Sequence, residues 1–341
     1  MPPSPSDNLP RIITYYQTHR KPNNDPISIL PLATPPSATH VILAALHVNN
    51  DPDNLSLNDD PVDSPRYLSL WAELRILQAS GVKVLAMLGG AARGTYQRLD
   101  GSQQSFEIYY APLRRLISHR GLDGLDLDVE EETSLNGIVR LIDRLRKDFG
   151  PHFLITLAPV AAALLDSNSN LSGFDYEALE VLRGSDIAWY NAQFYCGWGD
   201  LSSTYMYDLI LAKGWPPTKV VIGLVTNPAN GKGFVPWSLL EPVLAHIVKR
   251  HPRDFGGVMG WEYFNSLPGN DHRPWEWARQ MAHLLKSDHR VLPLDTTVQP
   301  PLSMPDSVTA SDAVVDPDEA DSHPLSIPTP FDYVSDGDEQ P

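Results

Sequence analysis

Short apolar runs rich in β-branched residues alternate with amphipathic stretches over residues 11–287 of this chain. The alternation restricts the fold strongly, because strands separated by helices must pair in parallel. We expect eight strands, at 11–16, 40–48, 83–88, 122–130, 153–158, 186–195, 219–225 and 256–261.

The helical stretches end at glycines, which readily adopt the left-handed conformation after a helix C-terminus. Five of them stop at Gly81, Gly121, Gly150, Gly184 and Gly214. Two more helices are expected over 237–250 and 274–287, with a break near Pro242 in the first. The connection after the first strand shows no helical pattern and is expected to be irregular.

Eight such units in about 280 residues predict a single (β/α)8 TIM barrel, which we place over 10–290. A doubly wound open sheet is the competing fold. That fold usually carries a glycine-rich phosphate-binding turn after its first strand, where this chain reads YYQTHRKPN. The pattern therefore favours the α/β barrel.

The charge of the chain lies mostly outside the predicted barrel. The formal net charge is −16, and residues 291–341 hold eleven acidic residues, nine prolines and no Lys or Arg, which leaves −5 for the first 290 residues. Such a segment buries too little apolar surface to fold. We expect a disordered acidic tail over 291–341, with solvation as its role, and a disordered leader over 1–9.

Composition also excludes several classes of function. An acidic chain is a poor nucleic-acid binder, and one cysteine forms neither an internal disulfide nor a cysteine zinc site. No apolar run has the length of a membrane span, and the first residues show no secretory pattern. The chain is expected to be a cytoplasmic monomer.

One expected strand, LDGLDLDVE at 122–130, is unusually acidic. Because alternate strand residues share a face, Asp126, Asp128 and Glu130 lie together and oppose an apolar face. Carboxylates so placed repel each other, yet the flanking helices indicate an internal strand. The acidic face is therefore expected to point into the barrel, with Glu130 at the C-terminal mouth, where barrel enzymes have their active sites.

Carboxyl groups packed this closely share protons, so the pKa of some rises and suits a general acid. A buried structural network and a divalent cation site are the alternatives. The eleven histidines contain no H-x-x-x-H or H-x-H pair near a strand end, which argues against a metal-dependent hydrolase. We expect neither a metal nor another cofactor.

At this strand the chain resembles glycoside hydrolase family 18, the chitinase-like family, whose motif is D-G-x-D-x-D-x-E on the fourth barrel strand. The motif is complete here, and YNAQFY at 190–195 and GGVMGWEYFNS at 256–266 extend the resemblance to roughly residues 10–287. The fungal endo-β-N-acetylglucosaminidase branch is the most similar part of the family, followed by plant and fungal chitinases. The motif residues are Asp123, Gly124, Asp126, Asp128 and Glu130.

The resemblance implies a retaining mechanism without an enzyme nucleophile. Glu130 would protonate the glycosidic oxygen, while the 2-acetamido oxygen of the −1 sugar attacks and forms an oxazolinium ion. Asp128 would hold the acetamido N–H, and Asp126 would hydrogen-bond Asp128. Tyr195 would donate its hydroxyl to the acetamido carbonyl.

Further residues are implied to bind the −1 sugar. Gln193 and Asn191 would line its site, and Trp261 would form an apolar floor. Tyr15 would touch the acetamido group, although Tyr16 has the other parity and either could face inward. Asp123 also has the wrong parity for the lumen, so a structural cap is the expected role of this residue.

Two positions depart from the family pattern. Met87 precedes Leu88-Gly89-Gly90 where the wider family has S-x-G-G, and Cys196 stands where plant-type chitinases usually have Asn. Methionine cannot supply the serine hydroxyl that helps to hold the strand-four acids. Neither change touches Glu130 or Tyr195, so we expect activity with altered subsite polarity.

The leading hypothesis is cleavage of the β-1,4 bond in the di-N-acetylchitobiose core of N-glycans. The alternative enzyme is a chitinase acting on chitin oligosaccharides, which usually needs several exposed aromatics along its cleft. A non-catalytic lectin on the same fold is a third reading, and the presence of Glu130 argues against it. The candidate cleft aromatics are Trp189, Trp198, Trp215 and Trp237.

Overall fold

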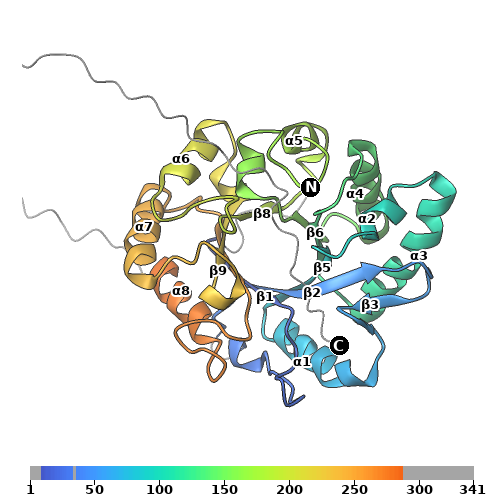
Figure 1. The fold of residues 1–341 in the computed structure, drawn as a ribbon, viewed down its shortest axis with the longest axis horizontal. Coiled ribbons are helices and arrows are strands. Elements are labelled where there is room, and N and C mark those ends of the chain that lie inside the picture. The colour runs from blue at the N-terminus through green and yellow to red at the C-terminus, as the bar shows by residue number, and fades with distance from the viewer. Residues whose placement is uncertain (1–8, 34–35, 287–341) are drawn as a thin grey trace, which may run out of the picture. The chain divides into compact units, whose positions relative to one another are not determined.

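The computed structural model describes residues 9–33 and 36–286, in which parallel strands close into a barrel ringed by helices (Figure 1). Each barrel strand pairs in parallel with the next, and β10 pairs with β1 to close the ring. The predicted (β/α)8 barrel is confirmed. Its strands are β1 (Arg11–Tyr16), β2 (His40–Val48), β5 (Lys83–Gly89), β6 (Gly124–Asp128), β7 (Leu154–Leu157), β8 (Trp189–Gln193), β9 (Val220–Val225) and β10 (Gly257–Trp261).

The helices follow the strands and cover the outside of the barrel. Glycine ends some of them as expected, since Gly121 after α3 has φ 64° and its N–H bonds to the Ile117 carbonyl. The α-helices are α1 (Leu68–Ala79), α2 (Thr95–Leu99), α3 (Gln103–Arg120), α4 (Leu135–Phe149), α5 (Tyr176–Arg183), α6 (Tyr205–Ala212), α7 (Trp237–Arg250) and α8 (Glu276–Lys286). Short 3-10 turns are η1 (Leu30–Leu32), η2 (Pro65–Tyr67), η3 (Ala161–Leu164), η4 (Pro217–Lys219) and η5 (Pro228–Asn230).

The connection from β1 to β2 is irregular, as expected, and η1 is its regular element in the described residues. An antiparallel excursion, β3 (Leu55–Leu57) and β4 (Asp60–Pro61), extends from β2 and was not predicted, because three residues are too few to show a pattern. The predicted break near Pro242 is wrong. Helix α7 is continuous there, and its buried Leu244 and Ile247 anchor the turns beyond the missing N–H.

Three of the strands end earlier than predicted, β7 by one residue at Leu157. Strand β6 ends at Asp128 and β8 at Gln193, so Glu130 and Tyr195 lie in the segments that follow. The predicted tail over 291–341, and all but the last residue of the leader over 1–9, lie outside the described residues. In the described part, no helix is long and apolar enough to cross a membrane.

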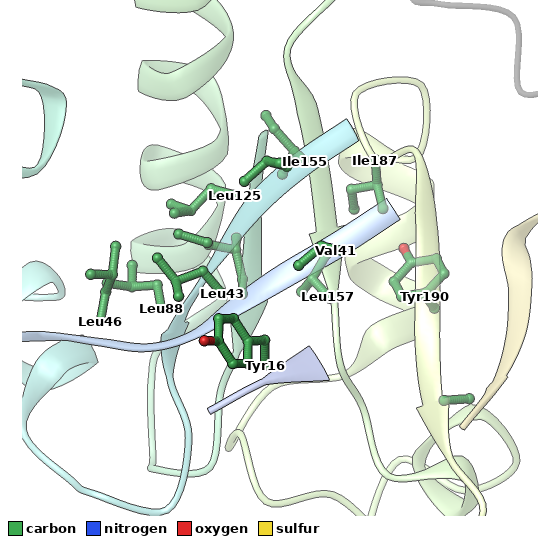
Figure 2. Close-up of a cluster of buried hydrophobic side chains, with 14 of the residues drawn as sticks. Tyr16, Val41, Leu43, Leu46, Leu88, Leu125, Ile155, Leu157, Ile187 and Tyr190 are labelled. Atoms are coloured by element: carbon green, nitrogen blue, oxygen red, sulfur yellow. The ribbon is translucent and has the colours of Figure 1, made fainter. Parts of the chain in front are cut away.

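Side chains alternate between two apolar layers along the barrel strands. On β2, Val41 and Leu43 face the helices, whereas Ile42 and Ala44 face the lumen. Figure 2 shows part of the outer layer, where Leu125, Ile155 and other strand residues gather outside the barrel. Each fully buried side chain of this size stabilises the fold by about 1.5–3 kcal/mol. This layer therefore fixes which strand positions face the lumen.

Candidate active site

A cleft of about 690 Å³ opens at the C-terminal ends of the barrel strands. Asp128, Glu130 and Trp261 lie on it, together with Met87 and the Gly89-Gly90 pair at the end of β5. Loops after β1 and β2 form one wall. The cleft is thus at the end of the barrel where the acidic strand was expected to present its carboxyl groups.

Asp126 lies below the cleft and is completely buried. The Tyr15 hydroxyl donates to its Oδ2 at 2.7 Å, while the Thr156 hydroxyl and the Asn191 amide donate to its Oδ1 at 2.5 and 2.9 Å. Burial raises the pKa of Asp126, and the three hydrogen bonds oppose that rise. Tyr15, Thr156 and Asn191 thus supply donors to Asp126. The hydrogen bond from Asp126 to Asp128 that the resemblance implied stays a prediction.

Asp128 is buried, with 6% of the residue exposed. Burial raises its pKa well above the usual range, and the charges of Glu130 and Asp126 raise it further. Its side chain has one long contact, from Gln193 Nε2 at 3.4 Å to Oδ1. With so little compensation for its buried charge, the Asp128 carboxyl loses its proton only at a higher pH.

Glu130 lies at the mouth of the cleft and is half-buried. Burial raises the pKa of its carboxyl, and a hydrogen bond from Gln193 acts in the opposite direction. The charge of Glu130 also raises the pKa of Asp128, so ionising one of the two carboxyl groups disfavours ionising the other. This arrangement keeps a proton next to solvent-accessible space, as a general acid requires.

The aromatic residues of the site come from β1, from the segment after β8 and from β10. Tyr195 is buried, and burial followed by the charges of Asp128 and Glu130 raises its pKa well above the usual range. Its hydroxyl therefore remains a hydrogen-bond donor. Trp261 is half-buried and packs edge to face against Tyr15, with ring centroids 5.6 Å apart.

Tyr15, not Tyr16, faces the lumen. The Tyr15 hydroxyl bonds Asp126, whereas Tyr16 points outward and donates to the Ile27 carbonyl. Asp123 also faces away from the lumen, and its carboxylate accepts from Val84 N–H at 2.9 Å and pairs with Lys83 Nζ. That arrangement fits the structural cap expected for Asp123.

The two amide residues of β8 are buried deeply. Asn191 holds Asp126, and its own Oδ1 accepts from Trp189 Nε1 at 2.9 Å, which fixes the orientation of the amide. Gln193 donates to the Ala158 carbonyl at 2.9 Å while it approaches Asp128. Contact of either amide with a sugar stays a prediction.

The departures Met87 and Cys196 both lie near the site. Met87 lines the cleft, and its Cε would lie 2.9 Å from a Cβ placed on Gly90. Gly89 has φ 92°, and a Cβ there would lie 2.5 Å from the Asp128 carbonyl oxygen. The close backbone approaches that Gly89 and Gly90 allow are thus kept, although the family's serine is absent. Cys196 is half-buried, and burial raises the pKa of its thiol.

Three polar residues of the site escaped the sequence analysis. Thr156 lies at an inward-facing position of the apolar run LITL. A polar residue within an apolar run was the only sign of its role in the sequence. Glu262 follows Trp261 and accepts from the N–H groups of Gln17 and Thr18 at 3.1 and 2.8 Å, which holds the loop after β1 against β10. Glu131 follows Glu130 and accepts two backbone N–H groups of the loop after β5.

Metal binding was the alternative reading of the acidic strand. Over residues 9–33 and 36–286, no three His, Cys, Asp or Glu side chains are arranged so that they could hold a metal ion. The carboxyl groups of the site thus face hydroxyl, amide and backbone donors.

Known proteins share both the sequence and the fold. The model for glycosyl hydrolases family 18 matches residues 11–235. A chitinase, ChiC, from Aspergillus fumigatus is 57% identical with a TM-score of 0.74, and the match covers 80% of this chain and 98% of that chain. A fungal endo-β-N-acetylglucosaminidase of family 18 is 50% identical with a TM-score of 0.78, covering 82% of this chain and 99% of that chain.

Two curated relatives are more distant in sequence, and both are longer than this chain. Chitinase 2 from Rhizopus oligosporus is 31% identical over 212 residues, which are 57% of this chain and 36% of that protein. The match to chitinase 1 from Rhizopus niveus covers 40% of that protein, so the chain spans less than half the length of these two relatives. The family match includes β1 to β9 and the whole acidic strand. On this evidence the chain belongs to the glycosyl hydrolases family 18.

Proposed function

We propose that this protein is a retaining glycosidase that cleaves the β-1,4 bond between the two GlcNAc residues in the core of N-glycans. The observation that carries the proposal is the pair of carboxyl groups Asp128 and Glu130, whose pKa values both rise, on a cleft that Trp261 also lines. A pair that shares a proton supplies an acid and an anion from one site.

In the proposed reaction, Glu130 gives its proton to the glycosidic oxygen as the C1–O bond breaks. The 2-acetamido oxygen of the −1 sugar forms a bond to C1 and yields an oxazolinium ion, with Asp128 on the acetamido N–H and Tyr195 on the carbonyl oxygen. Water then attacks C1, the bond from C1 to the acetamido oxygen breaks and restores the acetamido group, and the water gives a proton to Glu130. Two inversions leave the anomeric configuration unchanged.

The polarity of the cleft supports a branched glycan over a linear chitin chain. Among the described residues that line it, Trp261 and Tyr67 carry the only indole or phenol rings, while polar side chains of the lining include His47, Asn58 and Asp59. Mannose-rich branches present many hydroxyl groups, which polar side chains can bond. A long chitin chain presents repeated apolar faces, which stack on aromatic rings.

Two of the four candidate cleft tryptophans are unavailable to a substrate. Trp189 and Trp215 are buried, and Trp189 packs beneath Arg11 at the bottom of the barrel. Trp198 and Trp237 are half-buried. These two keep chitin hydrolysis as the second candidate, and the 57% identity to a fungal chitinase favours it as well. A cytoplasmic location and a monomeric state stay predictions.

The test offers the protein a high-mannose glycoprotein and, separately, a chitin oligosaccharide, and follows both products by mass. Glycoprotein that retains one GlcNAc per site supports the proposal, whereas shortened chitin oligosaccharides alone support the second candidate. Glu130→Gln should lower either activity by about 10²–10⁴-fold, the usual contribution of general acid catalysis. Cleavage of neither substrate by the wild type, or an unchanged rate in Glu130→Gln, would reject the mechanism.

A further inference from the structure

Glu130 lies beyond the part of β6 that the sheet holds. Strand β6 ends at Asp128, and its last residue paired with β7 is Leu127. A general acid must stay within hydrogen-bond reach of the glycosidic oxygen, and an error of about 1 Å can cost about 10²-fold in rate. Contacts outside the sheet must therefore fix the backbone at Glu130.

Glu131 provides two such contacts. Its side chain is 3% exposed, and its Oε2 and Oε1 accept the backbone N–H groups of Gly94 and Tyr96, both at 2.7 Å. Both donors lie where α2 begins, at positions whose N–H groups have no partner within the helix. One carboxylate thus ties the segment after β6 to the segment after β5.

The segment after β5 is itself fixed to the other side of Glu130. The Tyr96 hydroxyl donates to the Leu88 carbonyl at 2.7 Å, and the Tyr96 ring fills the space that a Cβ on Gly89 would need. The Gly90 N–H donates to the Asp128 carbonyl at 2.9 Å. Residues Asp128 and Glu131, on either side of Glu130, are therefore anchored to the same short segment.

A third contact holds the chain just after Glu131. The Thr133 hydroxyl donates to the Glu131 carbonyl at 3.1 Å, and the Thr133 N–H donates to the Ser172 carbonyl at 2.9 Å. Among the contacts described above, the Glu131 carboxylate is the one side chain that links the segment after β6 to the loop after β5. Its loss would remove two of the hydrogen bonds that hold the Glu130 segment, while the bond from Gly90 N–H to the Asp128 carbonyl and the bonds from Ser134 to Asp100 would remain.

We propose that Glu131 is a positioning residue that fixes Glu130 for proton transfer to the leaving group. The inference rests on the proposed function, in which Glu130 is the general acid. In Glu131→Gln, the amide oxygen can accept one backbone N–H, while the amide NH2 would face the other and leave it unpaired. Glu130 would then lose its fixed position while the acetamido contacts remain.

The test compares two substrates that share the same oligosaccharide up to the −1 GlcNAc. One has GlcNAc as its leaving group, and the other has 4-nitrophenolate, which departs without protonation. We expect Glu131→Gln to lower kcat by about 10–100-fold on the first substrate and by less than about threefold on the second. Glu132→Gln is the matched control, since Glu132 is exposed, and it should match the wild type on both.

The nitrophenyl substrate also reports whether the variant is folded. Equal losses on both substrates, or wild-type activity of Glu131→Gln on the GlcNAc substrate, would overturn the positioning role. Glu130→Gln separates this result from the proposed function. If Glu130→Gln shows no selective loss on the GlcNAc substrate, the general-acid assignment itself fails. If it shows that loss and Glu131→Gln does not, only the positioning role of Glu131 fails.

Discussion

Replacing Thr156 by Val tests how the barrel tolerates a buried charge at Asp126. Valine has the shape of threonine, so the change removes the hydroxyl that donates to Asp126 Oδ1 and leaves the packing nearly unchanged. Asp126 would keep the bonds from Tyr15 and Asn191. The effect on the free energy of unfolding should therefore come from one hydrogen bond.

The size of that effect should depend on pH. A hydrogen bond to an ionised group contributes about 1.5–3 kcal/mol, and a neutral one about 0.5–1.5 kcal/mol. Burial already raises the pKa of Asp126 above 3.8 in the folded protein, so ionisation of Asp126 costs stability as pH rises through the folded-state pKa. Removing a donor raises that pKa further. Thr156→Val should thus lose about 1.5–3 kcal/mol near neutral pH and less in acid.

Thermal unfolding of wild type and variant, followed between acid and neutral pH, measures this difference. A loss of 1.5–3 kcal/mol corresponds to a fall in Tm of about 3–12 °C for a domain of this size class. Thr14→Val is the matched control, because the buried Thr14 hydroxyl has no hydrogen-bond partner. Its replacement should be neutral or stabilising at every pH, since no bond is lost.

The pH dependence decides whether the reasoning holds. A loss in Thr156→Val that is the same in acid and at neutral pH would mean that Asp126 is not an anion held by its donors. A loss of equal size in Thr14→Val would mean that replacing a buried threonine of a barrel strand by valine is itself costly, whatever its hydrogen bonds. Either result would refute the account of Asp126 given above.

Three further changes test other parts of the site. Tyr195→Phe should lower kcat by about 10–100-fold with unchanged Tm, because only a hydroxyl near the acetamido group is lost; steady-state kinetics measures this. Gly89→Ala should destabilise the protein by about 2–4 kcal/mol in denaturant unfolding, since φ is 92° and the new Cβ would meet the Asp128 carbonyl. A chelator such as EDTA should leave the rate of glycan release unchanged, and a loss restored by a divalent cation would contradict the proposed mechanism.

The face on which each strand residue lies could be predicted from the sequence, because side chains alternate between the two faces with a period of two. This period correctly placed Asp126 and Asp128 inside the barrel, and the fold followed from the alternation of strands and helices. The pattern could not tell whether Tyr15 or Tyr16 faces the lumen. Both lie at the end of the same strand, and a shift of one residue exchanges their faces. The bond to Asp126 makes that choice, and it joins positions 111 residues apart.

Hydrogen-bond partners were the part of the site that the sequence could not supply. Thr156 and Asn191 lie 30 and 65 residues from Asp126, and neither belongs to a motif that names its partner. Strand ends were also misplaced, because the acidic run continues past the point where backbone pairing stops. A residue pattern shows which face of a strand a side chain occupies, but it does not show where the backbone hydrogen bonds to the neighbouring strands end.

The neighbouring carboxyl groups of this site differ in function because they differ in donors, not in residue type. Asp126 receives three hydrogen bonds and Glu131 receives two backbone N–H groups, so both act as fixed acceptors. Asp128 and Glu130 have burial, each other and the Gln193 amide, and their pKa values rise. The proton therefore stays where donors are scarce, and that is the pair next to the cleft. Supplying a new donor to Asp128 should accordingly lower the pKa of that carboxyl, so that the pair would lose its proton at a lower pH.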